Sequence, residues 1–112
     1  MITIEQLKEI QQRADKLRQY LAIDEKRVQL EEEELRTQDP GFWEDAKAAE
    51  AQMRKVKGIK AWIEGYEGVR AATEELQLAF DYCKEELVTE EEVDAAYAHA
   101  IKEVEALEMK NM

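Results

Sequence analysis

The chain has 112 residues, of which 38% are charged, and its formal net charge is −11. This length suits one domain with a modest core, and the acidic balance disfavours general nucleic-acid binding, because phosphate contacts need lysine and arginine. Since no apolar run approaches the roughly 20 residues that cross a bilayer and a single cysteine cannot form an internal disulfide, we expect a cytoplasmic protein without membrane contact.

The first segment has the pattern of an amphipathic helix. Thr3 and Gln6 form a capping-box pair at its start. The apolar residues that follow recur three and four apart: Leu7, Ile10, Ala14, Leu17 and Leu21. That spacing predicts one buried seam, and its interruption predicts a kink or a short break near residues 22–24, with Asp24 able to cap a second piece. The acids from Glu31 to Glu34 point in different directions on a helix, which indicates a solvated turn rather than a metal site.

The sequence changes character at residues 39–45, Asp-Pro-Gly-Phe-Trp-Glu-Asp. Asp-Pro-Gly is strong turn chemistry, because proline fixes φ and pushes the preceding residue out of the helical region. Phe42 and Trp43 carry large apolar surfaces, so we expect them to pack at least partly into the bundle and to form a structural corner. A binding site is the alternative for this aromatic pair. Asp45 stands where the next helix needs its N-cap.

The next helix is predicted from about Ala46 to Glu86. The apolar positions expected to be buried in its first half are Ala49, Met53, Val56, Ile59 and Ile63, and in its second half Trp62, Tyr66, Val69, Thr73, Leu76, Phe80, Cys83 and Leu87. Gly58, Gly65 and Gly68 permit close helix approach or local bending. They do not have the spacing of a nucleotide-binding loop, and no strand precedes them.

A second capping box, Thr89 with Glu92, starts the last helix. His99 lies off the apolar stripe of this helix, so we expect it to face solvent, while Cys83 is expected to behave as a small core hydrophobe. No second histidine exists to act as a base for a nucleophile. We therefore expect no enzyme activity, no catalytic residue, no cofactor, no metal and no small-molecule substrate.

No strand-like alternation occurs anywhere in the sequence. The predicted fold is all-α: an elongated, antiparallel, coiled-coil-like bundle of three helices, the first of them kinked or split, in one domain covering residues 1–112.

The charge is unevenly distributed along the chain. Residues 1–46 carry 12 acids and 7 bases (net −5), residues 47–70 carry 3 acids and 6 bases (net +3), and residues 71–112 carry 12 acids and 3 bases (net −9). The basic stretch consists of Lys47, Arg54, Lys55, Lys57 and Lys60. This stretch either contacts RNA or an acidic partner, or it forms ion pairs with the acidic faces of neighbouring helices within the bundle.

Three stretches carry a resemblance to a known family: residues 17–26, residues 39–45 with Ala49 after them, and residues 60–64. In order and spacing they resemble the N-terminal domain of bacterial peptide chain release factor 2, the class I family that reads UGA and UAA stop codons. The resemblance covers essentially the whole chain. One departure is Ala22, where the family usually has aspartate.

The resemblance implies a domain that contacts the ribosome, at the stalk base of the large subunit, and that positions the factor. The family's Gly-Gly-Gln tip and its Ser-Pro-Phe codon-reading tripeptide do not occur in this sequence. We therefore expect an isolated N-terminal domain that lacks the decoding and catalytic domains and has no release activity of its own. Charge and periodicity alone leave an alternative, a self-contained acidic coiled-coil scaffold that pairs with another helical protein.

Overall fold

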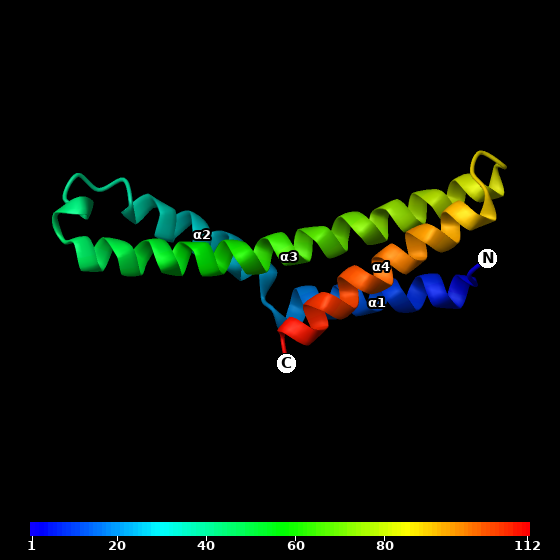
Figure 1. Ribbon diagram of the computed structural model, residues 1–112, viewed down its shortest axis with the longest axis horizontal. Helices are drawn as coiled ribbons and strands as arrows, with labels where there is room; N and C mark the ends of the chain where they lie inside the picture. Colours follow the sequence, from blue (N-terminus) through cyan, green and yellow to red (C-terminus); the bar gives the residue numbers. More distant parts are fainter.

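The computed structural model describes residues 1–112 as an all-helical, elongated molecule measuring 60 × 28 × 18 Å (Figure 1). Its elements, in chain order, are α1 (Ile4–Tyr20), α2 (Ile23–Arg36), the 3₁₀ turn η1 (Phe42–Glu44), α3 (Ala46–Lys84) and α4 (Glu90–Lys110). The predicted fold class is confirmed, including the split of the first helical segment into two helices. No helix combines the length and the apolar character needed to cross a membrane.

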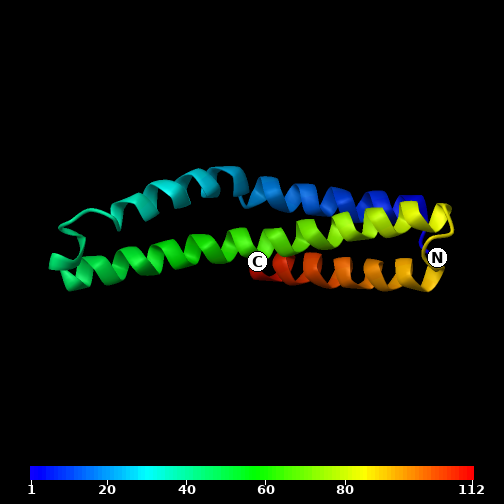
Figure 2. The same cartoon turned by 90° about the horizontal axis from the view of Figure 1, so that it is seen from above.

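Helix α3 is the spine of the molecule, and the other helices cover its two halves unequally. α2 lies along the first half of α3, whereas α1 and α4 lie along the second half, and α4 ends beside the middle of the spine (Figure 1, Figure 2). The molecule is therefore a three-helix bundle at one end and a helical hairpin at the other. This hairpin, α2 together with residues 46–63 of α3, is called the arm.

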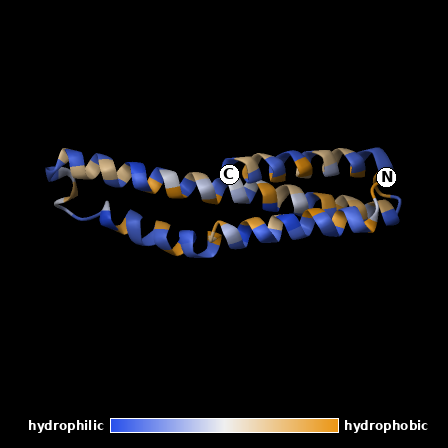
Figure 3. Cartoon of the chain, turned by 90° about the horizontal axis from the view of Figure 1, so that it is seen from below, coloured by the Kyte–Doolittle hydropathy of each residue, from blue (hydrophilic) through white to orange (hydrophobic).

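The main core lies in the three-helix half. Its fully buried members are large aliphatic side chains from all the helices: Ile10, Ile23, Leu76, Val69, Val93 and Val104. In the arm the buried residues are fewer: Ala49, Val56, Ile59 and Ile63 of α3, and Ile23 and Glu33 of α2. The hydrophobic colouring is densest where α1, α3 and α4 lie together (Figure 3). Because apolar burial is the main source of stability, most of the folding free energy resides away from the arm.

The helix starts follow the predicted capping chemistry. Thr3 and Thr89 each accept a hydrogen bond from the backbone N–H three residues later, and Gln6 and Glu92 reach back to the cap N–H, so both capping boxes are confirmed. Asp45 accepts a 3.1 Å hydrogen bond from the backbone N–H of Ala48 at the start of α3. Each cap satisfies N–H groups that have no partner inside their own helix.

The break between α1 and α2 is made by the backbone of Ala22, which takes the left-handed conformation (φ 49°, ψ 51°). The Lys26 ammonium donates to the freed carbonyl of Leu21. Asp24 does not cap α2, contrary to the prediction. Its carboxylate instead accepts two hydrogen bonds from Arg18, at 2.9 and 3.1 Å, so it ties the end of α1 to the start of α2.

Helix α3 is continuous and ends at Lys84, two residues before the predicted end. Two residues of its predicted apolar repeat are exposed, Met53 at 44% and Leu87 at 71%, and two others, Trp62 and Cys83, are only half-buried. Leu87 lies beyond the end of the helix, after Glu86 with φ 59°, so the helical repeat no longer applies to it. Met53 lies on the arm, where no third helix covers it.

Candidate partner-binding surface

The basic stretch predicted from the sequence lies on the α3 side of the arm. All five side chains, Lys47, Arg54, Lys55, Lys57 and Lys60, are on exposed positions of one continuous helix. Residues three and four apart on a helix are neighbours on its surface. The stretch therefore spans adjacent faces of the first third of α3 rather than forming one narrow line.

Three of the five basic residues are held in ion pairs. Lys55 pairs with Glu33 at 3.3 Å and Lys60 with Glu34 at 3.2 Å, both across to α2, while Arg54 pairs with Glu50 of its own helix at 2.8 Å. Of the two alternatives for the basic stretch, pairing within the bundle therefore applies to Lys55 and Lys60, which neutralise acids of α2. Lys47 and Lys57 form no ion pair and remain available to a partner.

Glu33, in the acidic run Glu31–Glu34, is buried although the sequence predicted it to be solvated. It is only 5% exposed, whereas a solvated turn was predicted. The Gln52 amide donates both to the Glu33 carboxylate (2.6 Å) and to the Glu33 backbone carbonyl (2.9 Å), and Lys55 and Arg36 lie within ion-pair distance. The hydrogen bond from Gln52, aided by these two cations, lowers the pKa of Glu33 below its ordinary value. Glu33 therefore stays ionised and locks α2 onto α3.

A surface hollow of about 450 Å³ lies on α3 within the basic stretch. Met53 and Val56 supply its apolar part, and the charged residues around it are Glu50, Arg54, Lys57 and Lys60. An apolar floor with a mostly basic rim is suited to a ligand that has both an apolar and an acidic part. The other three hollows lack this combination: one is lined by polar side chains of α1 and α2 only, and the two with apolar lining residues have acids and bases in equal number around them.

The aromatic corner is less buried than predicted. Phe42 is half-buried, but Trp43 is 68% exposed, and the two rings meet edge to face with centroids 4.7 Å apart. The expectation that Trp43 packs into the bundle is therefore wrong. The Asp39 carboxylate accepts a 3.0 Å hydrogen bond from the Gly41 N–H, which closes the turn without help from the tryptophan. Trp43 is left as an exposed aromatic side chain at the tip of the arm, beside the basic stretch.

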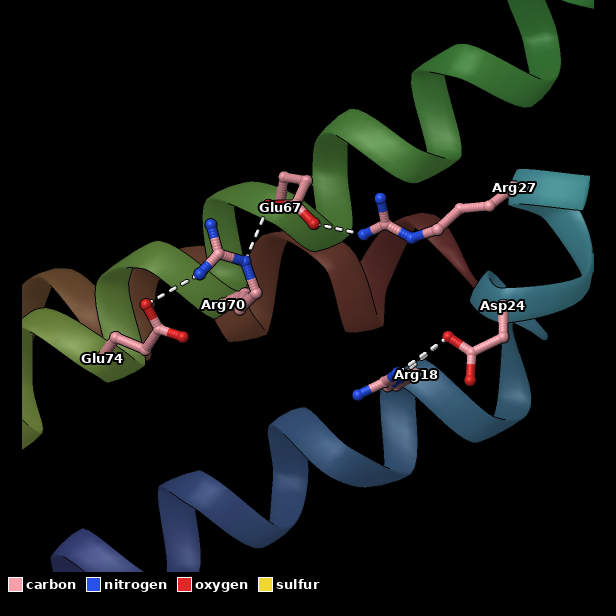
Figure 4. A network of polar contacts seen from close by, with 6 residues as sticks. All are labelled: Arg18, Asp24, Arg27, Glu67, Arg70 and Glu74. Carbon is pink, nitrogen blue, oxygen red and sulfur yellow. Dashed lines mark hydrogen bonds and ion pairs between the residues drawn. The ribbon is translucent and has the colours of Figure 1, made fainter. Parts of the chain in front are cut away.

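A second set of charges lies where the arm joins the three-helix half (Figure 4). Glu67 of α3 accepts hydrogen bonds from Arg27 of α2 and from Arg70, and Arg70 also pairs with Glu74 at 2.7 Å. Hydrogen bonds from Arg70 and then Arg27 lower the pKa of Glu67. Because every member has a partner within the chain, this network joins α2 to α3 close to the helix break.

The residues with potential for catalysis, His99 and Cys83, have separate contacts and none with each other. His99 is exposed, as predicted, and its ion-pair contact is with Glu103 at 4.0 Å. Cys83 is half-buried, packs against the main core and lies 3.9 Å from the Met1 sulfur. No group of three or more His, Cys, Asp or Glu side chains is arranged to hold a metal ion.

Comparison with known proteins identifies relatives over almost the whole chain. A protein named peptide chain release factor 2 from Pseudoalteromonas translucida is 30% identical over 113 aligned residues, which cover 97% of this chain and 30% of the relative. Peptide chain release factor 2 from Acidithiobacillus ferrooxidans is 33% identical over 108 residues, covering 93% of this chain and 29% of the relative. The resemblance to peptide chain release factor 2 is confirmed.

The chain spans about three tenths of the length of these release factor 2 relatives. No family model matches the chain, and no solved structure matches it.

Proposed function

We propose that the chain is the N-terminal, ribosome-contacting domain of a translation termination factor that directs peptide release at UGA and UAA codons. The observation that carries this proposal is the similarity of nearly the whole chain to two proteins named peptide chain release factor 2. In this proposal the domain contacts the stalk base of the large subunit and positions the factor, while decoding and peptide release belong to other domains.

The arm supplies the surface with which the domain meets the ribosome. Its support is the distribution of charge: residues 47–70 are the only part with a net positive charge (+3), whereas the flanking parts carry −5 and −9. An acidic surface is repelled by ribosomal RNA, so contact favours the end of the molecule that carries Lys47 and Lys57. Trp43 at the same tip adds an exposed aromatic of the kind enriched in binding hot spots.

The proposal is tested by co-sedimentation of the purified chain with ribosomes. Lys47 and Lys57 are replaced together by glutamate, because neither forms an ion pair within the chain. The matched control replaces Lys8 and Lys16 of α1, which are also exposed and unpaired, so that both variants change the net charge equally. Weaker association of the arm variant alone, at an unchanged unfolding temperature, supports the proposal. Equal association of all three proteins contradicts it.

The proposal that the chain itself is not an enzyme has a separate test. Ribosomes carrying peptidyl-tRNA at a UGA codon are incubated with the chain, and released peptide is measured. No release above background is expected, because the Gly-Gly-Gln sequence does not occur in it. Peptide release by this chain alone would refute this part of the proposal.

A further inference from the structure

Helix α2 carries apolar side chains on two of its faces, and only one of these faces is covered. Ile23 is buried in the main core, and the buried Glu33 faces α3. Val28 and Leu35, by contrast, are 58% and 60% exposed. No helix lies on the side of α2 that faces away from α3 (Figure 2). A helix that packs on one neighbour needs one apolar stripe, so the second stripe is unused within the chain.

The second stripe forms one continuous surface. At about 100° per residue, Val28 and Leu35 lie within about 20° of each other around the helix axis, and about 140–160° from Glu33. Glu31 and Glu32 lie on either side of this pair, each about 40–60° away from it. These four exposed residues, Val28, Glu31, Glu32 and Leu35, are called the α2 outer face.

The α2 outer face also continues the coiled-coil spacing of α1. The buried seam of α1 alternates by three and four residues from Leu7 to Leu21. The same spacing continues, with acids at two of its positions, over Asp24, Val28, Glu31 and Leu35. The left-handed backbone of Ala22 turns these positions away from the core. Such a repeat is typical of a helix that packs against a partner helix, and its second part has no partner in this chain.

We infer that the α2 outer face is a docking site for a basic amphipathic helix of a protein partner. The apolar side chains of that helix, one heptad apart, pack on Val28 and Leu35. Its lysines or arginines pair with Glu31 and Glu32. The inference goes beyond the proposed ribosome contact, because it concerns the other helix of the arm and does not depend on the basic stretch of α3.

Charge complementarity selects a basic occupant. α2 carries six acids and three bases. Glu33 and Glu34 form ion pairs within the chain, whereas Glu31 and Glu32 form none. Two unpaired carboxylates that flank an apolar stripe favour a partner with cations at the edges of its own apolar face.

The same two carboxylates disfavour the other occupants of an exposed helix face. RNA is repelled, because its phosphates gain affinity from cations and the α2 outer face offers none. A second copy of the chain that packs through the same face brings Glu31 and Glu32 against the identical residues of its partner, and like charges in contact are unfavourable. An amphipathic helix with basic edges uses both the apolar stripe and the acids.

The experiment measures binding of a fluorescein-labelled helical peptide to the whole chain by fluorescence anisotropy. The peptide repeats one heptad, with leucine at the a position and lysine at d, e and g. Val28→Gln with Leu35→Gln removes the apolar stripe. The matched control, Leu78→Gln with Tyr82→Gln, removes two other exposed apolar side chains from α3. We expect saturable binding that the α2 variant weakens by about tenfold or more, corresponding to about 1.4 kcal/mol, and that the control leaves unchanged.

A second pair of variants tests the charge complementarity. Glu31→Lys with Glu32→Lys reverses the charge of the α2 outer face, and Glu64→Lys with Glu75→Lys makes the same change in net charge at exposed positions of α3. The α2 variant is expected to lose peptide binding by about tenfold more than the α3 variant, because only its acids contact the peptide. Thermal unfolding followed by circular dichroism verifies that all four variants are folded.

Several outcomes overturn the inference. Two of them are the absence of peptide binding and an equal loss of binding in a variant and its matched control, since the peptide then responds only to net charge or to any exposed apolar side chain. Binding of an RNA oligonucleotide that the Val28 and Leu35 variant weakens assigns the face to nucleic acid instead. Concentration-dependent dimerisation that the same variant abolishes assigns it to a second copy of the chain.

Discussion

The glycines of α3 give a direct measure of where the helix is covered. Gly58 and Gly65 lie in the interior of the same helix, one heptad apart, and both have ordinary negative φ values. Replacing glycine by alanine inside a helix stabilises it by about 0.8–1 kcal/mol if the added methyl group meets nothing. Gly58 satisfies that condition, whereas the new methyl group at Gly65 lies 3.0 Å from the end of the Leu107 side chain.

The expected result is a stabilised Gly58→Ala variant and a Gly65→Ala variant that gains nothing. For a chain of 112 residues, an unfolding entropy of about 2.1 cal/mol/K per residue makes 1 kcal/mol equal to a shift of about 4 °C in the unfolding temperature. Gly58→Ala is thus expected to unfold about 3–4 °C higher. At Gly65 the same helix gain is offset by crowding against Leu107, since overpacking costs about 1–3 kcal/mol.

Thermal unfolding by circular dichroism, repeated at several protein concentrations, measures both variants against the parent chain. Equal stabilisation by the two substitutions would refute the close approach of α4 to α3 at Gly65. Destabilisation by Gly58→Ala would refute the openness of the arm, because something must then cover that position in solution. A double variant is expected to be additive, since the two positions share no partner.

Three further outcomes are expected. Leu76→Ala, at a position with 0% exposure, costs about 2–5 kcal/mol, whereas Leu87→Ala, at 71% exposure, changes stability by less than about 0.5 kcal/mol in urea titrations. Ala22→Gly raises stability by about 1 kcal/mol in the same assay, because glycine adopts φ 49° without the clash of a side chain. Glu67→Gln lowers the unfolding temperature at pH 7, and the difference from the parent chain disappears as pH falls through the lowered pKa of Glu67, where the protonated carboxyl no longer pairs with Arg70.

Local signals along the chain predicted the helix boundaries well. Both capping boxes and the Asp45 cap lie where side-chain chemistry demands them, since each signal acts on a backbone N–H only two or three residues away. The break near residues 22–24 was predicted from the interrupted apolar seam. The left-handed conformation at the break was not predicted, because position 22 is an alanine and not the glycine or asparagine that usually adopts it.

The errors concern residues whose environment depends on a distant helix. A large aromatic such as Trp43 predicts burial only where another element is available to cover it, and none reaches the tip of the arm. Glu33 was predicted to be solvated because acids in sequence look exposed, yet Gln52 and Lys55 on α3 make its burial favourable. Periodicity identifies the residues of one face but not the number of helices that reach it.

The helix lengths indicate that α4 leaves half of α3 without a third helix. At 1.5 Å per residue, the 39 residues of α3 span about 58 Å, while the 21 residues of α4 span about 32 Å and cannot cover it. The remainder is covered only by α2, which buries just Ile23 and Glu33 among its own residues. The apolar and basic surface beside Met53 is therefore exposed because of the unequal helix lengths.

The ion pairs of the arm change how its function has to be tested. Reversing the charge of Lys60 breaks its pair with Glu34, and reversing Lys55 removes a cation from the buried Glu33, so either change lowers stability whether or not the residue meets a partner. Loss of ribosome binding after such a change has two explanations. Lys47 and Lys57 have no partner in the chain, so their reversal alters the field at the surface and leaves the packing of α2 on α3 intact. They are therefore the two positions at which a binding defect reports on contact rather than on folding.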